Sequence, residues 1–96
     1  MSYHGTDFNR AKSIAEDGYD LNKGKRFAYG YGVYSTPDIK VAEKYAVQFS
    51  HEGRQYLVVL QNRVNPASLI RISANQTGDG EYWINSSDKD VRPYGI

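Results

Sequence analysis

The run Tyr56-Leu57-Val58-Val59-Leu60 is the most apolar stretch in the chain and constrains the fold more than any other feature. Its short length and its valines favour a strand, and a strand without polar positions is expected at the centre of a sheet. Asn65-Pro66 is expected to end it. The chain has 96 residues, so the remaining segments must pack around this strand as a single domain, residues 1–96.

Two segments before this strand have the periodicity of amphipathic helices. Their apolar residues recur at helical spacing, at Phe8, Ala11, Ile14 and Ala15 and again at Ala42, Tyr45, Ala46 and Phe49. Thr6 or Asp7 is expected to cap the first helix, and Gly18 to end it. Thr36 is expected to cap the second helix, with Pro37 at its first position.

Short strands are expected to supply most of the remaining structure. They are predicted at Met1–Gly5, Gly32–Ser35, Leu69–Ile72, Glu81–Ile84 and Val91–Ile96. Tyr19–Gly30 is expected to be a loop, and His51–Arg54 and Thr77–Gly80 to be turns. Pro93 places the last strand at an edge or a bulge. Helices early and strands late predict an α+β domain.

Composition narrows the classes of function. The formal net charge is only +1, whereas nucleic-acid-binding proteins usually have a strong basic excess, so no nucleic-acid partner is expected. The chain has no cysteine, so thiol chemistry and disulfides are excluded. No apolar run is long enough for a membrane span and no signal peptide opens the chain, so a cytoplasmic or nuclear setting is expected. The oligomeric state is left open.

Few residues in the sequence are candidates for catalysis or for binding a metal or a phosphate. His51 lies among polar residues in a turn, as surface histidines do, whereas His4 ends the first strand just before a helix. No third ligand lies near either histidine at metal spacing, so no metal site is predicted. Gly30-x-Gly32 lacks the third glycine and the preceding strand of a dinucleotide-binding fingerprint. Lys23, Lys25 and Arg26 form a basic cluster, either a solvated loop or a phosphate site.

Four motifs together carry a family resemblance. In order they are His4-Gly5-Thr6, Gly30-x-Gly32-Val33-Tyr34, Ala42-x-x-Tyr45 and Glu81-Tyr82. In order and spacing the chain resembles the poly(ADP-ribose) polymerase-like ADP-ribosyltransferases of the histidine–tyrosine–glutamate type, over nearly its whole length. The resemblance implies a minimal ADP-ribosyltransferase fold, a mostly antiparallel split sheet with two short helices, and NAD as co-substrate.

The resemblance also implies roles for single residues. His4 would bond an adenosine-ribose hydroxyl, the Gly5 backbone would hold the nicotinamide carboxamide, and Thr6 would complete this side of the site. Tyr34 and Tyr45 would sandwich the nicotinamide ring. The catalytic set would be His4, Tyr34 and Glu81, with Glu81 on the 2′-hydroxyl of the nicotinamide ribose. Arg26, or else Lys25, would contact the pyrophosphate. The chain departs from many members of the family at Ala42, where they have a serine that helps to hold the carboxamide.

The expected reaction is transfer of one ADP-ribose unit to a protein acceptor, because only Asn75–Gly80 is available between the late strands to build a site for chain growth. Tyrosine faces can bind the cationic pyridinium, and a carboxylate can stabilise an oxocarbenium-like ribose. Each residue also has a purely structural alternative. His4 could be a structural histidine, Tyr45 a core residue and Glu81 a polar residue at the start of a strand. Asp79 is the alternative candidate for the catalytic carboxylate.

Two other functions compete with this one. The first is an inactive binding module with the same fold. The second is a tRNA 2′-phosphotransferase, which normally has an arginine-histidine element where this chain has Gly32-Val33-Tyr34 and usually carries a further nucleic-acid-binding domain.

Overall fold

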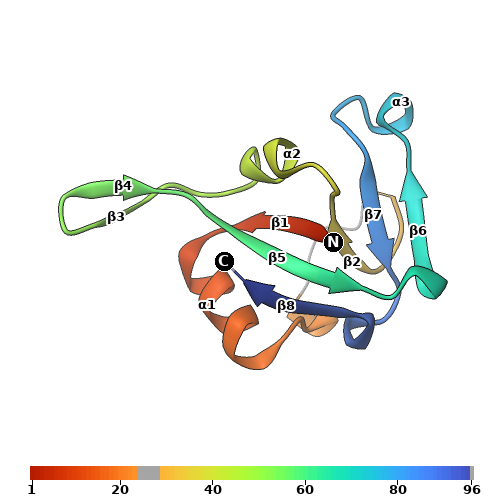
Figure 1. Cartoon of the computed structure of the whole chain (residues 1–96), viewed down its shortest axis with the longest axis horizontal. Helices are drawn as coiled ribbons and strands as arrows, with labels where there is room; N and C mark the ends of the chain where they lie inside the picture. The colour runs from red at the N-terminus through yellow and green to blue at the C-terminus, as the bar shows by residue number, and fades with distance from the viewer. Residues whose placement is uncertain (24–28, 96) are drawn as a thin grey trace.

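The computed structural model describes residues 1–23 and 29–95, and within them it has two three-stranded sheets, a hairpin and three short helices (Figure 1). The strands are β1 Ser2–Thr6, β2 Val33–Ser35, β3 Phe49–His51, β4 Arg54–Tyr56, β5 Val58–Val64, β6 Leu69–Ile72, β7 Tyr82–Asn85 and β8 Val91–Gly95. The helices are α1 Phe8–Asp17, α2 Ile39–Glu43 and α3 Ala74–Thr77. The predicted α+β class is confirmed, with one helix more than expected and with every strand pair antiparallel.

The apolar run supplies the centre of the first sheet, whose order is β1-β5-β8. Its central place is confirmed, and Leu60 is completely buried. The strand begins at Val58 because Tyr56 pairs in the β3–β4 hairpin instead. Asn65 ends it by capping a short 3₁₀ turn. β8 is an edge strand whose register shifts opposite Pro93, as expected for a proline that cannot donate to the ladder.

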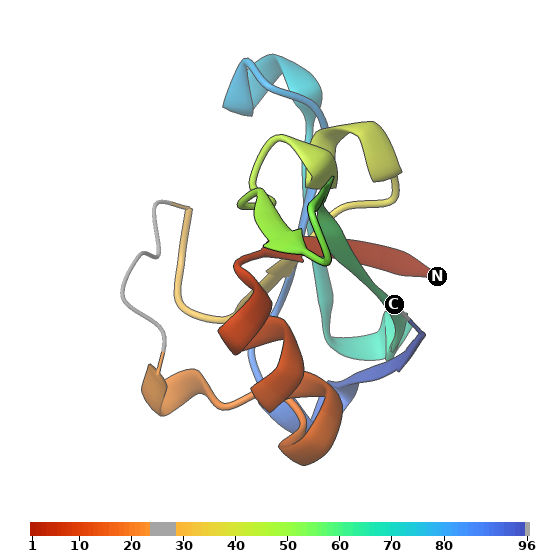
Figure 2. The same ribbon diagram turned by 90° about the vertical axis from the view of Figure 1, so that its left-hand side faces the viewer.

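The first sheet lies between two helices, with α1 on one side and α2 on the other (Figure 2). Ala11 of α1 packs against Val58 and Leu60 in the buried core. His4 pairs with Leu60 across the sheet, so its side chain is on this α1 face. Side chains alternate along a strand, so Gly5 faces α2. Asp7 caps α1 by accepting from the Arg10 N–H at 2.8 Å, and Gly18 ends the helix as predicted.

The second sheet has the order β2-β7-β6 and is joined to the first through one backbone bridge. The Tyr3 N–H donates to the Thr36 carbonyl at 2.7 Å, and the Thr36 N–H donates to the Tyr3 carbonyl at 2.9 Å. Thr36 is therefore buried in this bridge and does not cap α2, so its predicted role was wrong. This bridge places β2 beside β1, and with it Tyr34 close to His4.

The second helix is much shorter than its apolar periodicity predicted. Asp38 is its N-cap, accepting from the Lys40 N–H at 2.9 Å, and the helix ends at Glu43. The chain then turns, and the Val47 N–H donates to the carbonyl of Thr6 in β1. This pairing draws the backbone out of the helix, so Tyr45 lies in a turn and not on a helix. Tertiary pairing here overrides the local pattern.

The spacing of apolar residues predicts Phe49 on the face of the second helix, but Phe49 instead belongs to the β3–β4 hairpin. The hairpin turns at Glu52-Gly53, where both residues have a positive φ, +50° and +78°. This confirms the predicted turn and corresponds to the turn type that best fits two twisted strands. The Phe49 ring packs on Phe8 at a centroid distance of 4.7 Å, which anchors the hairpin to α1.

Candidate functional site

His4 lies where the two sheets meet. Its Nδ1 is 2.7 Å from the carbonyl oxygen of Tyr34, which can only accept, so Nδ1 carries the hydrogen and donates. Burial lowers the pKa of His4 from its ordinary value of 6.5, against the opposing effect of this hydrogen bond, and Arg10 lowers it further. The ring is therefore neutral near pH 7, and its Nε2 is an acceptor that makes no hydrogen bond to the described residues. Such an atom can accept a hydrogen bond from a hydroxyl group of a ligand.

Gly5 and Gly80 hold α2 against both sheets. A Cβ at Gly5 would lie 1.8 Å from the Ala42 carbonyl oxygen, and one at Gly80 would lie 2.6 Å from a methyl group of Val41. Gly80 also has φ +105°, which a side chain rarely tolerates. Glycine at these two positions lets β1 and the segment before β7 approach the same helix. The segments that carry His4, Tyr45 and Glu81 are thereby brought together.

Tyr34 and Tyr45 lie on the same face of the second sheet. Tyr34 pairs with Ile84, and Tyr82 lies two residues before Ile84 in β7, so Tyr34 and Tyr82 share a face. Tyr82 in turn makes a hydroxyl contact with Tyr45 and a ring contact at a centroid distance of 6.1 Å. The Tyr34 hydroxyl accepts from the Tyr29 N–H at 2.7 Å and donates to a carbonyl at 2.6 Å, so its ring is fixed to the segment before β2.

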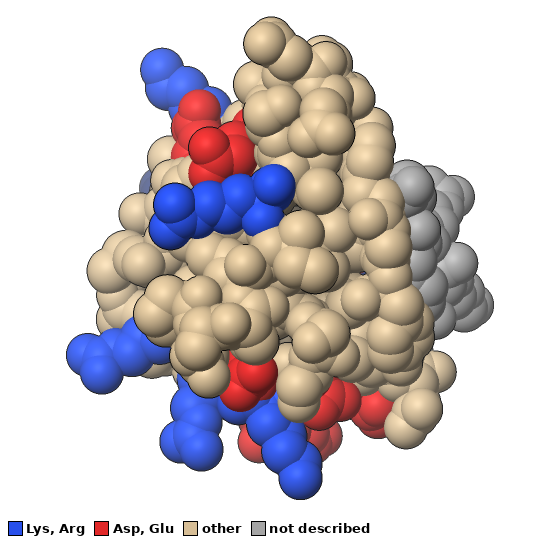
Figure 3. Space-filling model, turned by 90° about the vertical axis from the view of Figure 1, so that its right-hand side faces the viewer, with Lys and Arg blue, Asp and Glu red and all other residues tan. Residues whose placement is uncertain are grey.

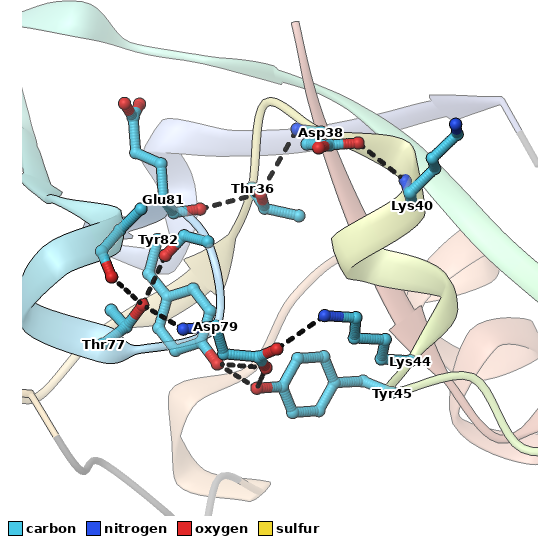
Figure 4. Close-up of polar contacts among 11 residues, drawn as sticks. Thr36, Asp38, Lys40, Lys44, Tyr45, Thr77, Asp79, Glu81 and Tyr82 are labelled. Carbon is cyan, nitrogen blue, oxygen red and sulfur yellow. Dashed lines mark hydrogen bonds and ion pairs between the residues drawn. The ribbon is translucent and has the colours of Figure 1, made fainter.

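Tyr45 belongs to a polar cluster around Asp79 (Figure 4). One carboxylate oxygen of Asp79 accepts from the hydroxyls of Tyr45, at 2.8 Å, and Tyr82, at 3.0 Å. The other forms an ion pair with Lys44 at 2.7 Å. Lys44 and then the two hydroxyls lower the pKa of Asp79, so the carboxylate is charged at neutral pH. Tyr45 is 50% exposed, so its ring is not core.

Glu81 is not part of this cluster. Its carboxylate accepts from the indole N–H of Trp83, which faces away from Tyr82. Figure 4 shows the Glu81 side chain directed away from the Asp79 carboxylate, while its backbone carbonyl accepts from the Thr36 hydroxyl at 2.8 Å. The structure thus brings Asp79, and not Glu81, to Tyr45. In this orientation the Glu81 carboxylate does not reach the tyrosines.

Two of the residues proposed to bind NAD, Thr6 and Arg26, add no side chain to the site that the structure describes. Thr6 is buried at the end of β1, and its carbonyl accepts from the N–H of Val47, so it positions the chain after α2. Arg26 lies outside the described residues, as does Lys25. The predicted gathering of His4, Tyr34, Tyr45 and Glu81 in one pocket therefore stays a prediction.

Sequence reasoning missed Tyr29, Tyr82 and Lys44. Tyr82 and Ile84 are two residues apart on one strand and therefore share a face. This spacing could have predicted that Tyr82 lies on the Tyr34 face. Nothing in the sequence indicates that Tyr29 packs on Tyr82, because that contact, with a centroid distance of 5.7 Å, depends on how the chain enters β2.

A shallow depression of about 390 Å³ lies elsewhere, between α1 and the β3–β4 hairpin. Phe8, Phe49 and Tyr56 line it, and none of the residues predicted to bind NAD does. It is an apolar surface rather than a chemical site.

Three further observations on the described residues concern metal ions, membranes and surface charge. Among residues 1–23 and 29–95, no group of histidine and acidic side chains is arranged to hold a metal ion. No helix in this part of the chain combines the length and the hydropathy needed to cross a membrane. On the face drawn in Figure 3, lysine and arginine side chains lie among aspartates and glutamates and form no continuous basic surface.

No protein-family model matches the chain, and no curated protein is significantly similar to it.

Proposed function

We propose that this protein has the ADP-ribosyltransferase fold and is an NAD-dependent mono-ADP-ribosyltransferase that modifies a protein acceptor. The support is the order of four sequence motifs together with the placement of their residues. His4 and Tyr34 lie on neighbouring strands, and Tyr45 is on the Tyr34 face of the second sheet.

The observation that carries the proposal is the hydrogen bond from His4 to the Tyr34 carbonyl. It fixes the tautomer of a neutral imidazole and leaves Nε2 as an acceptor beside the strand that bears Tyr34. A ribose hydroxyl is a suitable donor to that atom.

The proposed reaction needs few titratable side chains. The bond between ribose C1′ and the pyridinium nitrogen breaks, its electron pair stays on nitrogen, and neutral nicotinamide leaves without a general acid. The ribose becomes oxocarbenium-like, and the Glu81 carboxylate would stabilise it after turning from the Trp83 indole. A nucleophile from the acceptor then forms the new bond to C1′ and releases its proton to water.

One observation favours a second candidate, a binding module without turnover. The Glu81 carboxylate is engaged by Trp83 and lies away from Tyr45, an orientation that is unsuited to catalysis. This candidate predicts that NAD binds but that no nicotinamide is released.

Incubation with NAD labelled separately in the nicotinamide and adenine rings distinguishes these functions. The transferase releases labelled nicotinamide and leaves adenine label on protein, and mass spectrometry finds one unit per modified site. Repeated units would refute mono-transfer, and free ADP-ribose alone would indicate a hydrolase. Binding without nicotinamide release would support the module, and no binding at all would refute both proposals.

A further inference from the structure

Three tyrosines, Tyr29, Tyr45 and Tyr82, form an aromatic cluster on the surface, here called the tyrosine cluster. The Tyr82 ring meets Tyr29 at an interplanar angle of 75° and Tyr45 at 76°. Two rings thus stand nearly perpendicular to a third. Tyr45 is 50% exposed and Tyr29 is 40% exposed, so both side chains can be reached from the solvent. The face of a tyrosine ring attracts an organic cation.

A carboxylate lies at the polar edge of the tyrosine cluster. Asp79 accepts hydrogen bonds from the hydroxyls of Tyr45 and Tyr82 at 2.8 and 3.0 Å. A phenol that donates to an anion gains electron density in its ring, which strengthens the attraction of the ring face for a cation. A cationic ligand at these rings would therefore be attracted both by the charge of Asp79 and by the two tyrosine rings.

Lys44 opposes this effect. Its ammonium group is 2.7 Å from the second carboxylate oxygen of Asp79 and repels a cationic ligand. The cluster therefore holds one charge of each sign, and substitution of each should change the affinity for a cation in opposite directions. A purely structural role of the ion pair predicts damage of the same sign from either substitution.

We propose that Asp79 is a specificity-determining residue. Its carboxylate makes the tyrosine cluster prefer a positively charged pyridinium ring to a neutral pyridine ring of the same shape. The inference rests on the proposed function and adds Tyr29, Asp79, Tyr82 and Lys44 to its site. NAD carries the charged ring, and the nicotinamide that leaves is neutral. The same selectivity thus favours substrate binding and weakens retention of the product.

The test is titration of the folded protein with 1-methylnicotinamide, which is cationic, and with nicotinamide, which is neutral. For exposed charges we expect the wild-type protein to prefer the cation about two- to fivefold. Asp79→Asn should abolish this preference by weakening 1-methylnicotinamide more than nicotinamide, and Asp79→Glu should restore it. Lys44→Gln should increase the preference. Thermal unfolding of each variant checks that it is folded.

The proposal is overturned if the wild-type protein shows no preference, if neither compound binds, or if Asp79→Asn weakens both compounds equally. Its failure is distinguishable from that of the proposed function. Nicotinamide release from NAD without cation selectivity would refute only the role of Asp79. Cation selectivity that Asp79→Asn removes, in a protein that never cleaves NAD, would refute only the transferase.

Discussion

The two ends of the candidate site are held in different ways. At the His4–Tyr34 end, a side chain donates to the backbone of a neighbouring strand, and a backbone bridge between Tyr3 and Thr36 fixes that strand. At the tyrosine cluster, exposed side chains bond one another around Asp79. The first end is set by sheet pairing, whereas the second depends on side-chain rotamers that a ligand can change. We therefore expect the first to order the protein and the second to adapt to what binds.

The largest expected effect comes from the backbone contact that joins the two ends. In Gly5→Ala, the new methyl group would meet the Ala42 carbonyl at 1.8 Å, which forces α2 away from β1. We expect the free energy of unfolding to fall by about 3 kcal/mol, the upper part of the range for overpacking. Urea denaturation measures it.

Gly53→Ala is the matched control, because Gly53 also lacks a side chain but a Cβ there meets nothing within 4 Å. Its positive φ alone should cost about 1 kcal/mol. Equal losses in the two variants would show that the approach of α2 to β1 is not tight.

A second prediction concerns the two carboxylates. Glu81→Gln should leave NAD binding nearly intact and lower nicotinamide release by at least about 10²-fold, since the contact matters mainly in the transition state. Asp79→Asn should instead weaken NAD binding, with a smaller effect on the rate at saturation. Steady-state kinetics separates the two parameters. If Asp79→Asn abolishes turnover and Glu81→Gln does not, the catalytic assignment is wrong.

A third prediction compares the two ends directly. His4→Ala and Tyr45→Ala should each weaken NAD binding by about 1–3 kcal/mol, through loss of a hydrogen bond or of a stacked ring. His4→Ala should also lower the melting temperature, because the Tyr34 carbonyl loses its donor, whereas Tyr45→Ala should lower it less. Calorimetric titration and thermal melts measure both quantities. Unchanged affinity in both variants would refute the binding assignment.

The smallest expected effect is on pH dependence. The pKa of His4 is below its unfolded value of 6.5, so the unfolded chain takes up a proton first as the pH falls. Stability should thus decrease as the pH falls below about 6.5, by at most about 1.4 kcal/mol per pH unit for one proton. His4→Gln should flatten this slope, and the exposed control His51→Gln should retain it. An unchanged slope in His4→Gln would contradict the burial of a neutral imidazole.

The same comparison shows how much of the molecule could be predicted. The strands that carry His4 and Tyr34 followed from local patterns, and so did the central strand, because pairing and burial act there on contiguous residues. The site at Tyr45 did not. Its apolar spacing predicted a helix, but pairing of Val47 with Thr6 ends α2 early. The proximity of Asp79 to Tyr45 depends on the Gly80 turn against Val41, a contact between segments far apart in sequence.

The central claim is that both ends bind one NAD molecule, and an NMR titration of isotopically labelled protein with NAD tests it most directly. Signals of Gly5 and Tyr34 at one end, and of Tyr45 and Tyr82 at the other, should shift together with one dissociation constant. Phe8 and Tyr56, in the depression beside α1, serve as internal controls and should not shift. Shifts confined to one end, shifts at Phe8 and Tyr56 alone, or no shifts at all would contradict the claim.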